Sequence, residues 1–382
     1  MLISRTSYLA VKLKSNSKKI VIMARSFFRK APQFWERRGP TALLLWPLSW
    51  LYGLVLRVRK LISDLDLTHH QATPVPIIIV GNIRVGGTGK TPIVIAFAQR
   101  LAQLGWKPGI ISRGYGSSLI HPTQVHSNSD PMQVGDEPVL IAKRTDDQFP
   151  IWVFPKRQQS IKALLRHSPD VNVIISDDGL QHGGLLRWAA REGGRDIEFV
   201  VRDSRGEGNG FLLPAGPLRE SAHRGRDATL MTESTGSNKS GSLDEYFEGR
   251  RAFTLLGTLG TPYQLINPSN TQTFTQIADQ FLPTKITAVA ALGNPKRFFN
   301  ALQKQGIAGK WIPLPDHASY TPDFFADIKA ECILITEKDA VKCASIKDER
   351  IWVVPMTLNL PDNLMDWVQS ILHRPDPRPY NL

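Results

Sequence analysis

The segment from Val80 to Pro92, VGNIRVGGTGKTP, sets a glycine-rich turn, a lysine and a threonine directly after an apolar run. The unbroken apolar residues over 77–80 predict a buried parallel strand, and the apolar spacing over 92–104 predicts a helix with proline near its first turn. A glycine loop between a strand end and a helix N-terminus turns backbone N–H groups toward an anion. The segment therefore predicts a phosphate-binding loop in a parallel α/β sheet.

Each side chain of this loop suits a nucleoside triphosphate. Lys90 can reach the terminal phosphates, and the Thr91 hydroxyl can bind Mg²⁺. Arg84 stands where the common pattern G-x-x-x-x-G-K-[ST] has glycine, so the match covers the second half of that pattern. A turn that merely joins strand to helix is the structural alternative, and the flanking strand together with the lysine and threonine favours nucleotide binding. The expected cofactor-binding residues are Arg84, Val85, Gly86, Gly87, Thr88, Gly89, Lys90 and Thr91.

Two adjacent carboxylates follow a second apolar run. The stretch VNVIIS over 171–176 predicts a buried strand that ends at Asp177 and Asp178. Ligands of parallel sheets bind at the carboxyl ends of strands, and an acid placed there downstream of a phosphate loop can hold Mg²⁺. Either acid alone could instead cap the next helix. The pair, with Thr91, is the predicted metal site.

The positive charge of the chain is confined to its N-terminal part. The net charge is +13, and residues 1–60 hold 13 lysines and arginines against one acid, whereas the other 322 residues hold 34 basic and 33 acidic groups. A nucleic-acid binder that used its folded body would need a basic surface there. The neutral body therefore argues against a nucleic-acid partner.

An uncharged stretch of 16 residues over 41–56, TALLLWPLSWLYGLVL, lies between basic residues. As a helix it would span about 24 Å, which is less than the roughly 30 Å of a hydrocarbon core. Flanking cations and three aromatic residues favour a short, tilted or interfacial anchor attracted to anionic lipid. A core helix of the soluble body is the alternative.

Further apolar runs alternate with helical patterns along the rest of the chain, which is typical of a parallel α/β sheet. A polar stretch over 232–242 breaks this rhythm, and a second alternation begins near residue 286. The expected fold is a P-loop NTPase-like α/β sheet with helices on both faces, a second smaller α/β lobe and an N-terminal membrane-associated helix. The expected parts are a basic extension (1–40), an anchor helix (41–61), a P-loop domain (62–245), a linker (246–284) and the second lobe (285–382).

Nine sequence blocks occur in an order that resembles the tetraacyldisaccharide 4′-kinases, which phosphorylate a lipid A precursor at the inner membrane of Gram-negative bacteria. The resemblance runs from about residue 43 to the end, and its most specific blocks are DDGLQH and GNGFLLPAGPLRE. The blocks are PLSWLYG (47–53), VGN with GGTGKTP (80–92), SRGYG (112–116), GDEPVLIA (135–142), DDGLQH (177–182), GNGFLLPAGPLRE (208–220), GNPKRFF (293–299), DHASY (316–320) and TEKDAVK (336–342).

The resemblance implies ATP and Mg²⁺ as cofactors and an acylated glucosamine disaccharide 1-phosphate as acceptor. It also implies an anchor on the anionic cytoplasmic face of the bacterial inner membrane. We expect no nucleic-acid partner, because the body is neutral, and no obligate protein partner. The catalytic residues it implies are Lys90 for the phosphates, Asp136 as base for the sugar hydroxyl and His317 to orient that base. The substrate-side residues it implies are Arg113, Tyr115, Gln181, His182 and Asn209. Asp203 and Arg205 lie in a loosely matched stretch, 201–210, and receive no role.

A second class of function is compatible with the loop. A deviant phosphate-loop ATPase could act as a membrane-associated switch that binds and releases partners. Such switches usually carry a lysine just before the paired glycines, and this chain has Val85 there. The sequence thus favours a lipid kinase over a switch.

Overall fold

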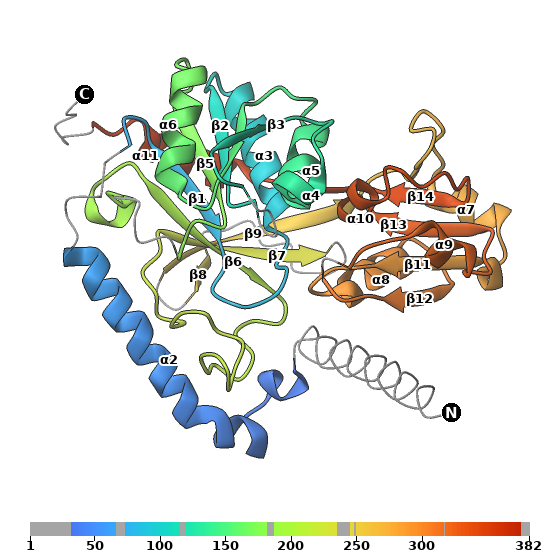
Figure 1. The fold of residues 1–382 in the computed structure, drawn as a ribbon, viewed down its shortest axis with the longest axis horizontal. Coiled ribbons are helices and arrows are strands. Elements are labelled where there is room, and N and C mark those ends of the chain that lie inside the picture. Colours follow the sequence, from blue (N-terminus) through green and yellow to red (C-terminus); the bar gives the residue numbers. More distant parts are fainter. Residues whose placement is uncertain are drawn as a thin grey trace, which may run out of the picture.

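The computed structural model describes residues 32–65, 73–114, 119–181, 187–234, 245–247, 250–316 and 318–375. Within these ranges the chain forms two sheets, a larger one with strands from residues 77–259 and 356–359, and a smaller one on the right of Figure 1. Long apolar helix α2 (Pro40–Leu65) lies at the lower left of Figure 1 and bonds to the segment 208–220. The predicted α/β class with a second, smaller lobe is confirmed.

The larger sheet has ten strands in the described residues, ordered β15-β9-β7-β6-β1-β5-β2-β4-β3, with β8 paired to β9. Its seven central strands run parallel, and β3, β8 and β15 are antiparallel to their neighbours. Its strands are β1 (Ile77–Gly81), β2 (Pro108–Ser112), β3 (Thr123–Val125), β4 (Ile151–Val153), β5 (Val173–Asp177), β6 (Ile197–Asp203), β7 (Ala228–Ser234), β8 (Glu245–Phe247), β9 (Arg250–Leu259) and β15 (Met356–Asn359).

Helices cover both faces of this sheet because successive strand residues point to opposite sides. Ile78 and Val80 pack in one core with helices α3 (Lys90–Gln103), α5 (Asp136–Arg144) and α11 (Asp362–Leu372). Ile77 and Ile79 pack in a second core with α6 (Arg157–His167). Burial on both faces explains why β1 and β5 are continuous apolar runs in the sequence. Short α4 (Pro131–Val134) precedes α5, and η2 (Ala190–Glu192) precedes β6.

The smaller sheet is ordered β10-β14-β13-β11-β12, with β10 as its antiparallel edge. Helices α7 and α8 supply apolar side chains to one core of this lobe, and α9 to the other. The elements of this lobe are β10 (Tyr263–Gln264), α7 (Phe274–Gln280), η3 (Pro283–Lys285), β11 (Ile286–Ala290), α8 (Pro295–Lys304), β12 (Lys310–Pro313), α9 (Pro322–Ala326), β13 (Cys332–Thr336), α10 (Glu337–Lys342) and β14 (Ile351–Val354).

The chain crosses between the two sheets more often than the sequence suggests. The range 246–284, expected as a linker, contains β9, which pairs with β7 in the larger sheet. The range 285–382, expected as one lobe, leaves that lobe after β14, because β15 pairs with β9 and α11 packs on the larger sheet. Strand pairing between distant segments has no local signal in the sequence, so the sequence could not show which sheet these segments join.

Helix α2 presents an apolar surface that the rest of the described protein leaves exposed. Leu44, Trp50 and Ile62 expose 79%, 70% and 61% of their surface. The range Pro40–Ile62 is long and apolar enough to cross a membrane by length and composition, with mean hydropathy 1.4 and 11% of its most apolar window buried. The helix is thus longer than the range 41–61 expected from the sequence, and Pro47 lies within it.

Candidate active site

The phosphate loop joins β1 to α3 and has the conformation that its glycines allow. Gly86 and Gly89 have φ angles of +105° and +80°, which side chains disfavour, and Gly89 directly precedes the first residue of α3, Lys90. The loop therefore lies at the N-terminal end of a buried 14-residue helix, where the helix dipole attracts anions. The strand, loop and helix predicted from the sequence are confirmed.

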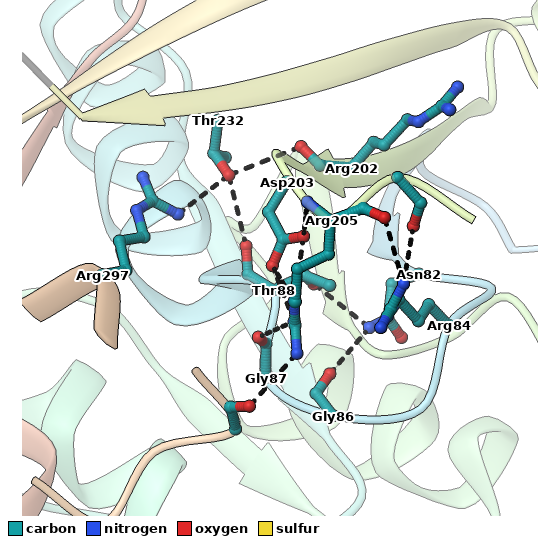
Figure 2. Close-up of polar contacts among 12 residues, drawn as sticks. Asn82, Arg84, Gly86, Gly87, Thr88, Arg202, Asp203, Arg205, Thr232 and Arg297 are labelled. Carbon is teal, nitrogen blue, oxygen red and sulfur yellow. Dashed lines mark hydrogen bonds and ion pairs between the residues drawn. The ribbon is translucent and has the colours of Figure 1, made fainter. Parts of the chain in front are cut away.

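Asn82, a residue that the sequence argument did not single out, organises the loop from its start. Its Nδ2 donates to the Gly86 carbonyl and to Thr88 Oγ1, both at 3.1 Å (Figure 2). Its Oδ1 accepts from Lys90 Nζ at 3.4 Å. The side chain is completely buried. A polar residue straight after a buried strand, within the VGN block, was the available signal.

The residues at the start of the loop, Arg84 and Val85, bond to other segments of the chain. The Arg84 side chain is buried, donates to the carbonyls of Arg205 and Gly206 at 3.2 and 3.3 Å, and pairs with Glu36. The backbone N–H of Val85 donates to the Pro217 carbonyl at 2.9 Å. Arginine in place of the usual glycine thus joins the loop to the segments before and after it.

Lys90 and the two predicted metal ligands lie together at the carboxyl end of β5. Lys90 Nζ is 3.2 Å from Asp178 Oδ1, and Arg219 Nη1 is 3.4 Å from Asp178 Oδ2. Burial would raise the pKa of Asp178, but Lys90 and Arg219 outweigh it and hold that pKa below its usual range. Asp178 is accordingly a carboxylate at neutral pH.

Asp177 has the opposite electrostatic environment. It is 1% exposed, and neither carboxylate oxygen has a hydrogen-bond partner among the described residues. Burial, reinforced by the nearby Glu137 carboxylate and opposed by Lys90, raises the pKa of Asp177 to about 7. A buried carboxylate without a partner is unfavourable unless a cation binds there. Asp177 therefore fits a metal-ligand role.

Arg157, the first residue of α6, holds the backbone of the acid pair. Its Nη2 donates to the backbone carbonyls of Asp177 and Asp178 at 2.7 and 3.1 Å, and its side chain is 1% exposed. Burial lowers the pKa of Arg157 to about 10, so the guanidinium stays charged at neutral pH. The guanidinium fixes the backbone on which both carboxylates are presented. No pattern in the sequence distinguished Arg157 from other arginines.

The predicted base, Asp136, is the first residue of α5 and is 8% exposed. Its Oδ1 accepts from the Glu137 N–H at 3.0 Å. Lys338, from α10 of the smaller lobe, lies 2.9 Å from Glu137 Oε1 and 3.4 Å from Asp316 Oδ1. Burial lowers the pKa of Lys338, but Glu137, Asp316 and Asp136 together raise it above its usual value. The start of α5 thus meets the smaller lobe through a partly buried charge cluster.

The predicted substrate-side residues have different surroundings. Arg113 follows β2 and is exposed, whereas Gln181 donates from Nε2 to the Asn82 carbonyl at 2.9 Å. Asn209 is 4% exposed, and its Nδ2 donates to the carbonyls of Phe34 and Ala215 at 3.2 and 2.8 Å. Tyr115, His182 and His317 lie outside the described residues.

The block GNGFLLPAGPLRE (208–220) forms the hydrogen bonds that hold α2 against the rest of the protein. Ser49 Oγ donates to the Leu212 carbonyl at 2.7 Å and accepts from the Ala215 N–H at 3.1 Å. Tyr52 Oη donates to the Arg219 carbonyl at 3.2 Å, and Arg219 pairs with Asp178. Arg219 therefore connects the apolar helix to the acid pair, because its carbonyl bonds to Tyr52 and its side chain pairs with Asp178.

Asp177 and Thr91 offer oxygen atoms that suit a magnesium ion bound together with phosphates. No group of three or more His, Cys, Asp and Glu side chains suited to a metal occurs in the described part of the chain. Phosphotransfer sites hold Mg²⁺ with one or two carboxylates, a hydroxyl, waters and the phosphates, so a protein-only cage is not needed. The partnerless oxygens of Asp177, with Thr91 7% exposed at the start of α3, match that donor set.

A parallel α/β sheet with a glycine-lysine-threonine loop and paired acids at adjacent strand ends defines a P-loop phosphotransferase type of protein. Comparisons with known proteins give the family. A family model described as tetraacyldisaccharide-1-P 4′-kinase matches residues 41–373. The chain belongs to the tetraacyldisaccharide 4′-kinase family, which confirms the kinase activity and the role in lipid A biosynthesis expected from the motifs.

Individual relatives agree over nearly the whole chain. A tetraacyldisaccharide 4′-kinase of Polynucleobacter asymbioticus is 73% identical over 363 residues, covering 94% of this chain and 100% of the relative. One from Herminiimonas arsenicoxydans is 44% identical over 342 residues, covering 88% and 92%. The crystal structure of LpxK from Aquifex aeolicus in complex with ATP has a TM-score of 0.66 and 24% identity, covering 87% of this chain and 99% of that one. That likeness shows the fold.

Proposed function

We propose that the protein transfers the γ-phosphate of Mg-ATP to the 4′-hydroxyl of a tetraacylated glucosamine disaccharide 1-phosphate, at the cytoplasmic face of the bacterial inner membrane. This proposal rests on the position of Lys90, Asp177 and Asp178, which lie together at the carboxyl ends of the central strands β1 and β5. Lys90 Nζ is 3.2 Å from Asp178 Oδ1. Groups that bind phosphates and groups that bind a cation occupy one place, as phosphoryl transfer requires.

On the donor side, the N–H groups of the loop and the ammonium of Lys90 hold the phosphates. Asp177 and Thr91 would bind Mg²⁺, which, when present, neutralises charge on the transferred group. Asp178 keeps Lys90 in place through its ion pair, and Arg219 keeps Asp178 charged. This division of roles follows from the different pKa values of the two acids.

On the acceptor side, Asp136 accepts the proton of the sugar hydroxyl as the new bond to phosphorus forms. The role comes from the family resemblance, and its position at the N-terminus of α5 supports it, because the helix dipole stabilises the carboxylate. His317 orients this base by the same resemblance. Since the histidine follows β12 of the smaller lobe in the chain, the dyad would form only when the lobes are close, which excludes water from ATP.

The membrane surface supplies the acceptor. The exposed apolar residues of α2 suit the acyl region, and the basic residues at both of its ends suit anionic headgroups. Contact of α2 with block 208–220, whose Arg219 pairs with Asp178, supports a position of that surface near the acids. A lipid held in the membrane could thus present its sugar to the site.

The proposal is tested by following radiolabel from the γ-phosphate of Mg-ATP to the disaccharide lipid in detergent, with Lys90→Ala as control. Label on the lipid with the parent protein, absent with Lys90→Ala, is the expected result. Hydrolysis of ATP with no labelled lipid would overturn the proposed acceptor and favour the partner-binding switch. Flotation with anionic and neutral vesicles tests the membrane contact, and equal binding to both would contradict the proposed preference.

A further inference from the structure

Arg205 contacts both lobes and the phosphate loop, although no motif assigns it a role. Its Nη2 donates to the Gly87 carbonyl at 2.7 Å, and its Nη1 donates to the Gly293 carbonyl at 3.1 Å (Figure 2). Gly87 belongs to the phosphate loop and Gly293 to the smaller lobe, just after β11. One guanidinium therefore joins the nucleotide loop of the larger sheet to the backbone of the other lobe.

The guanidinium is held rigidly by a partner on its own segment. Asp203, at the end of β6, accepts from Arg205 Nε at 3.0 and 3.1 Å and from Nη2 at 2.6 Å. The side chains of Asp203 and Arg205 are 2% and 17% exposed. A forked, buried pair of this kind fixes the plane of the guanidinium, which lysine could not reproduce. Arg205 is thus oriented before any nucleotide binds.

Three successive carbonyls of the loop are held by side chains from three different strand ends. The Gly86 carbonyl accepts from Asn82 and the Gly87 carbonyl from Arg205. The Thr88 carbonyl, at 3.5 Å, shares the single proton of the Thr232 hydroxyl with the Arg202 carbonyl at 3.4 Å. In a trans peptide the N–H points opposite to the C=O. Holding these carbonyls therefore directs the following N–H groups away from the clamping side chains, toward the side left for an anion.

The smaller lobe approaches the loop so closely that only glycine fits. A Cβ on Gly293 would overlap the backbone nitrogen of Gly87. A second link comes from Arg297 of α8, whose Nη1 donates at 3.0 Å to the Thr232 hydroxyl that holds Thr88. Movement of the smaller lobe would consequently change the contacts of the Gly87 and Thr88 carbonyls.

We propose that Arg205 is a positioning residue that sets the direction of the phosphate-loop N–H groups and makes this setting depend on contact with Gly293 of the smaller lobe. The loop would grip a nucleotide phosphate best when the two lobes touch. This inference rests on the proposed function only in taking ATP as the nucleotide. It assigns to Arg205 no contact with the reacting atoms.

The test compares Arg205→Lys, which keeps a charge for Asp203, with Arg100→Ala as a matched control. Arg100 lies on α3 and makes an exposed ion pair with Asp362 at 2.7 Å, so its loss should leave ATP binding unchanged. The dissociation constant of Mg-ATP is measured by calorimetry on the full chain in detergent, and KM values for ATP and lipid are measured separately. Loss of the two charge-assisted hydrogen bonds is expected to weaken ATP binding about tenfold or more, with KM for lipid nearly unchanged.

Gly293→Ala gives an independent variant that acts on the same contact from the other lobe. It should weaken ATP binding in the same direction, and the double variant should lose less than the product of the two single losses, because both remove one coupling. Multiplicative losses, or wild-type ATP binding by Arg205→Lys, would overturn the inference. Absence of ATP binding by the parent protein would instead overturn the proposed function, so the two failures are distinguishable.

Discussion

At the scale of single residues, adjacent Asp177 and Asp178 show how position alone separates two identical side chains. Asp178 faces Lys90 and Arg219 and stays charged, whereas Asp177 is buried without a hydrogen-bond partner in the described structure. The folded protein therefore keeps one carboxylate in an unfavourable place. Such a cost is common where a site waits for a cation.

The raised pKa of Asp177 gives a stability prediction with a definite sign. An acid whose pKa is higher in the folded than in the unfolded state favours folding below its unfolded pKa, and this contribution is lost as pH rises toward the folded value of about 7. At pH 8 without Mg²⁺, Asp177→Asn is expected to raise the thermal midpoint and to abolish most kinase activity. Calorimetric scans at pH 8 and pH 5 check this, because the gain should shrink at the lower pH. A lower midpoint at pH 8 would contradict the argument.

The proposed base gives a kinetic prediction. Asp136→Ala should lower turnover by about a hundredfold or more, while ATP binding changes little, because proton acceptance matters only as the reaction proceeds. Asp136→Asn, which keeps the shape, should be impaired to a similar extent. Steady-state kinetics at saturating ATP measure the effect. Near-normal turnover in either variant would remove Asp136 from the mechanism.

At the scale of elements, α2 has two unlike surfaces. One carries Ser49 and Tyr52, which bond to block 208–220, and the other exposes large apolar residues. The first surface is the part of this mostly exposed, apolar helix that the rest of the protein covers. Block 208–220, one of the two most specific blocks of the resemblance, therefore holds the helix, and its Arg219 pairs with Asp178.

The two surfaces of α2 are separable by substitution. Ser49→Val leaves the Leu212 carbonyl and the Ala215 N–H without their partner, which costs about 1–3 kcal/mol for each buried group. It is expected to speed hydrogen exchange in 208–220 while vesicle binding persists. Leu51→Ala, at a site 58% exposed, should instead weaken vesicle flotation and leave that exchange unchanged. The opposite pattern would show that the two surfaces are assigned in reverse.

At the scale of the whole molecule, the lobes meet through charged groups beside the proposed base. Lys338 bridges Glu137 and Asp316, and Arg144 Nη1 donates to both Glu337 oxygens at 2.8 Å. Glu137 follows Asp136, and Asp316 precedes His317 in the sequence. A single lysine therefore ties together the two segments that carry the proposed catalytic pair.

Removing that lysine should affect the reaction more than nucleotide binding. Lys338→Met leaves two partly buried carboxylates facing each other, and their repulsion is expected to separate the lobes near Asp136. Turnover should fall about tenfold to a hundredfold, with KM for ATP changed only a few times. Lys338→Arg keeps the charge and should recover part of the loss. A large rise in KM for ATP with unchanged turnover would place Lys338 at the nucleotide instead.

Much of this architecture follows from local sequence patterns. The phosphate loop, most of the parallel strands and the acid pair were predictable because burial on both faces imposes unbroken apolar runs, and because φ angles at Gly86 and Gly89 require glycine. The apolar helix was predictable from composition, although its length was underestimated. These features depend on neighbours in the chain.

Other features depend on contacts between distant segments. Asn82, Arg157, Arg205 and Lys338 gained their importance only where strand ends and lobes converge, and polar side chains of these types occur throughout the sequence. The return of β15 and α11 to the larger sheet is a matter of pairing with β9, which no local pattern encodes. The sequence by itself determined the kind of fold, the loop and the family, because these reside in local order and periodicity. Tertiary structure alone decided which charges meet, because an ion pair or a clamped peptide exists only where folding brings its parts together.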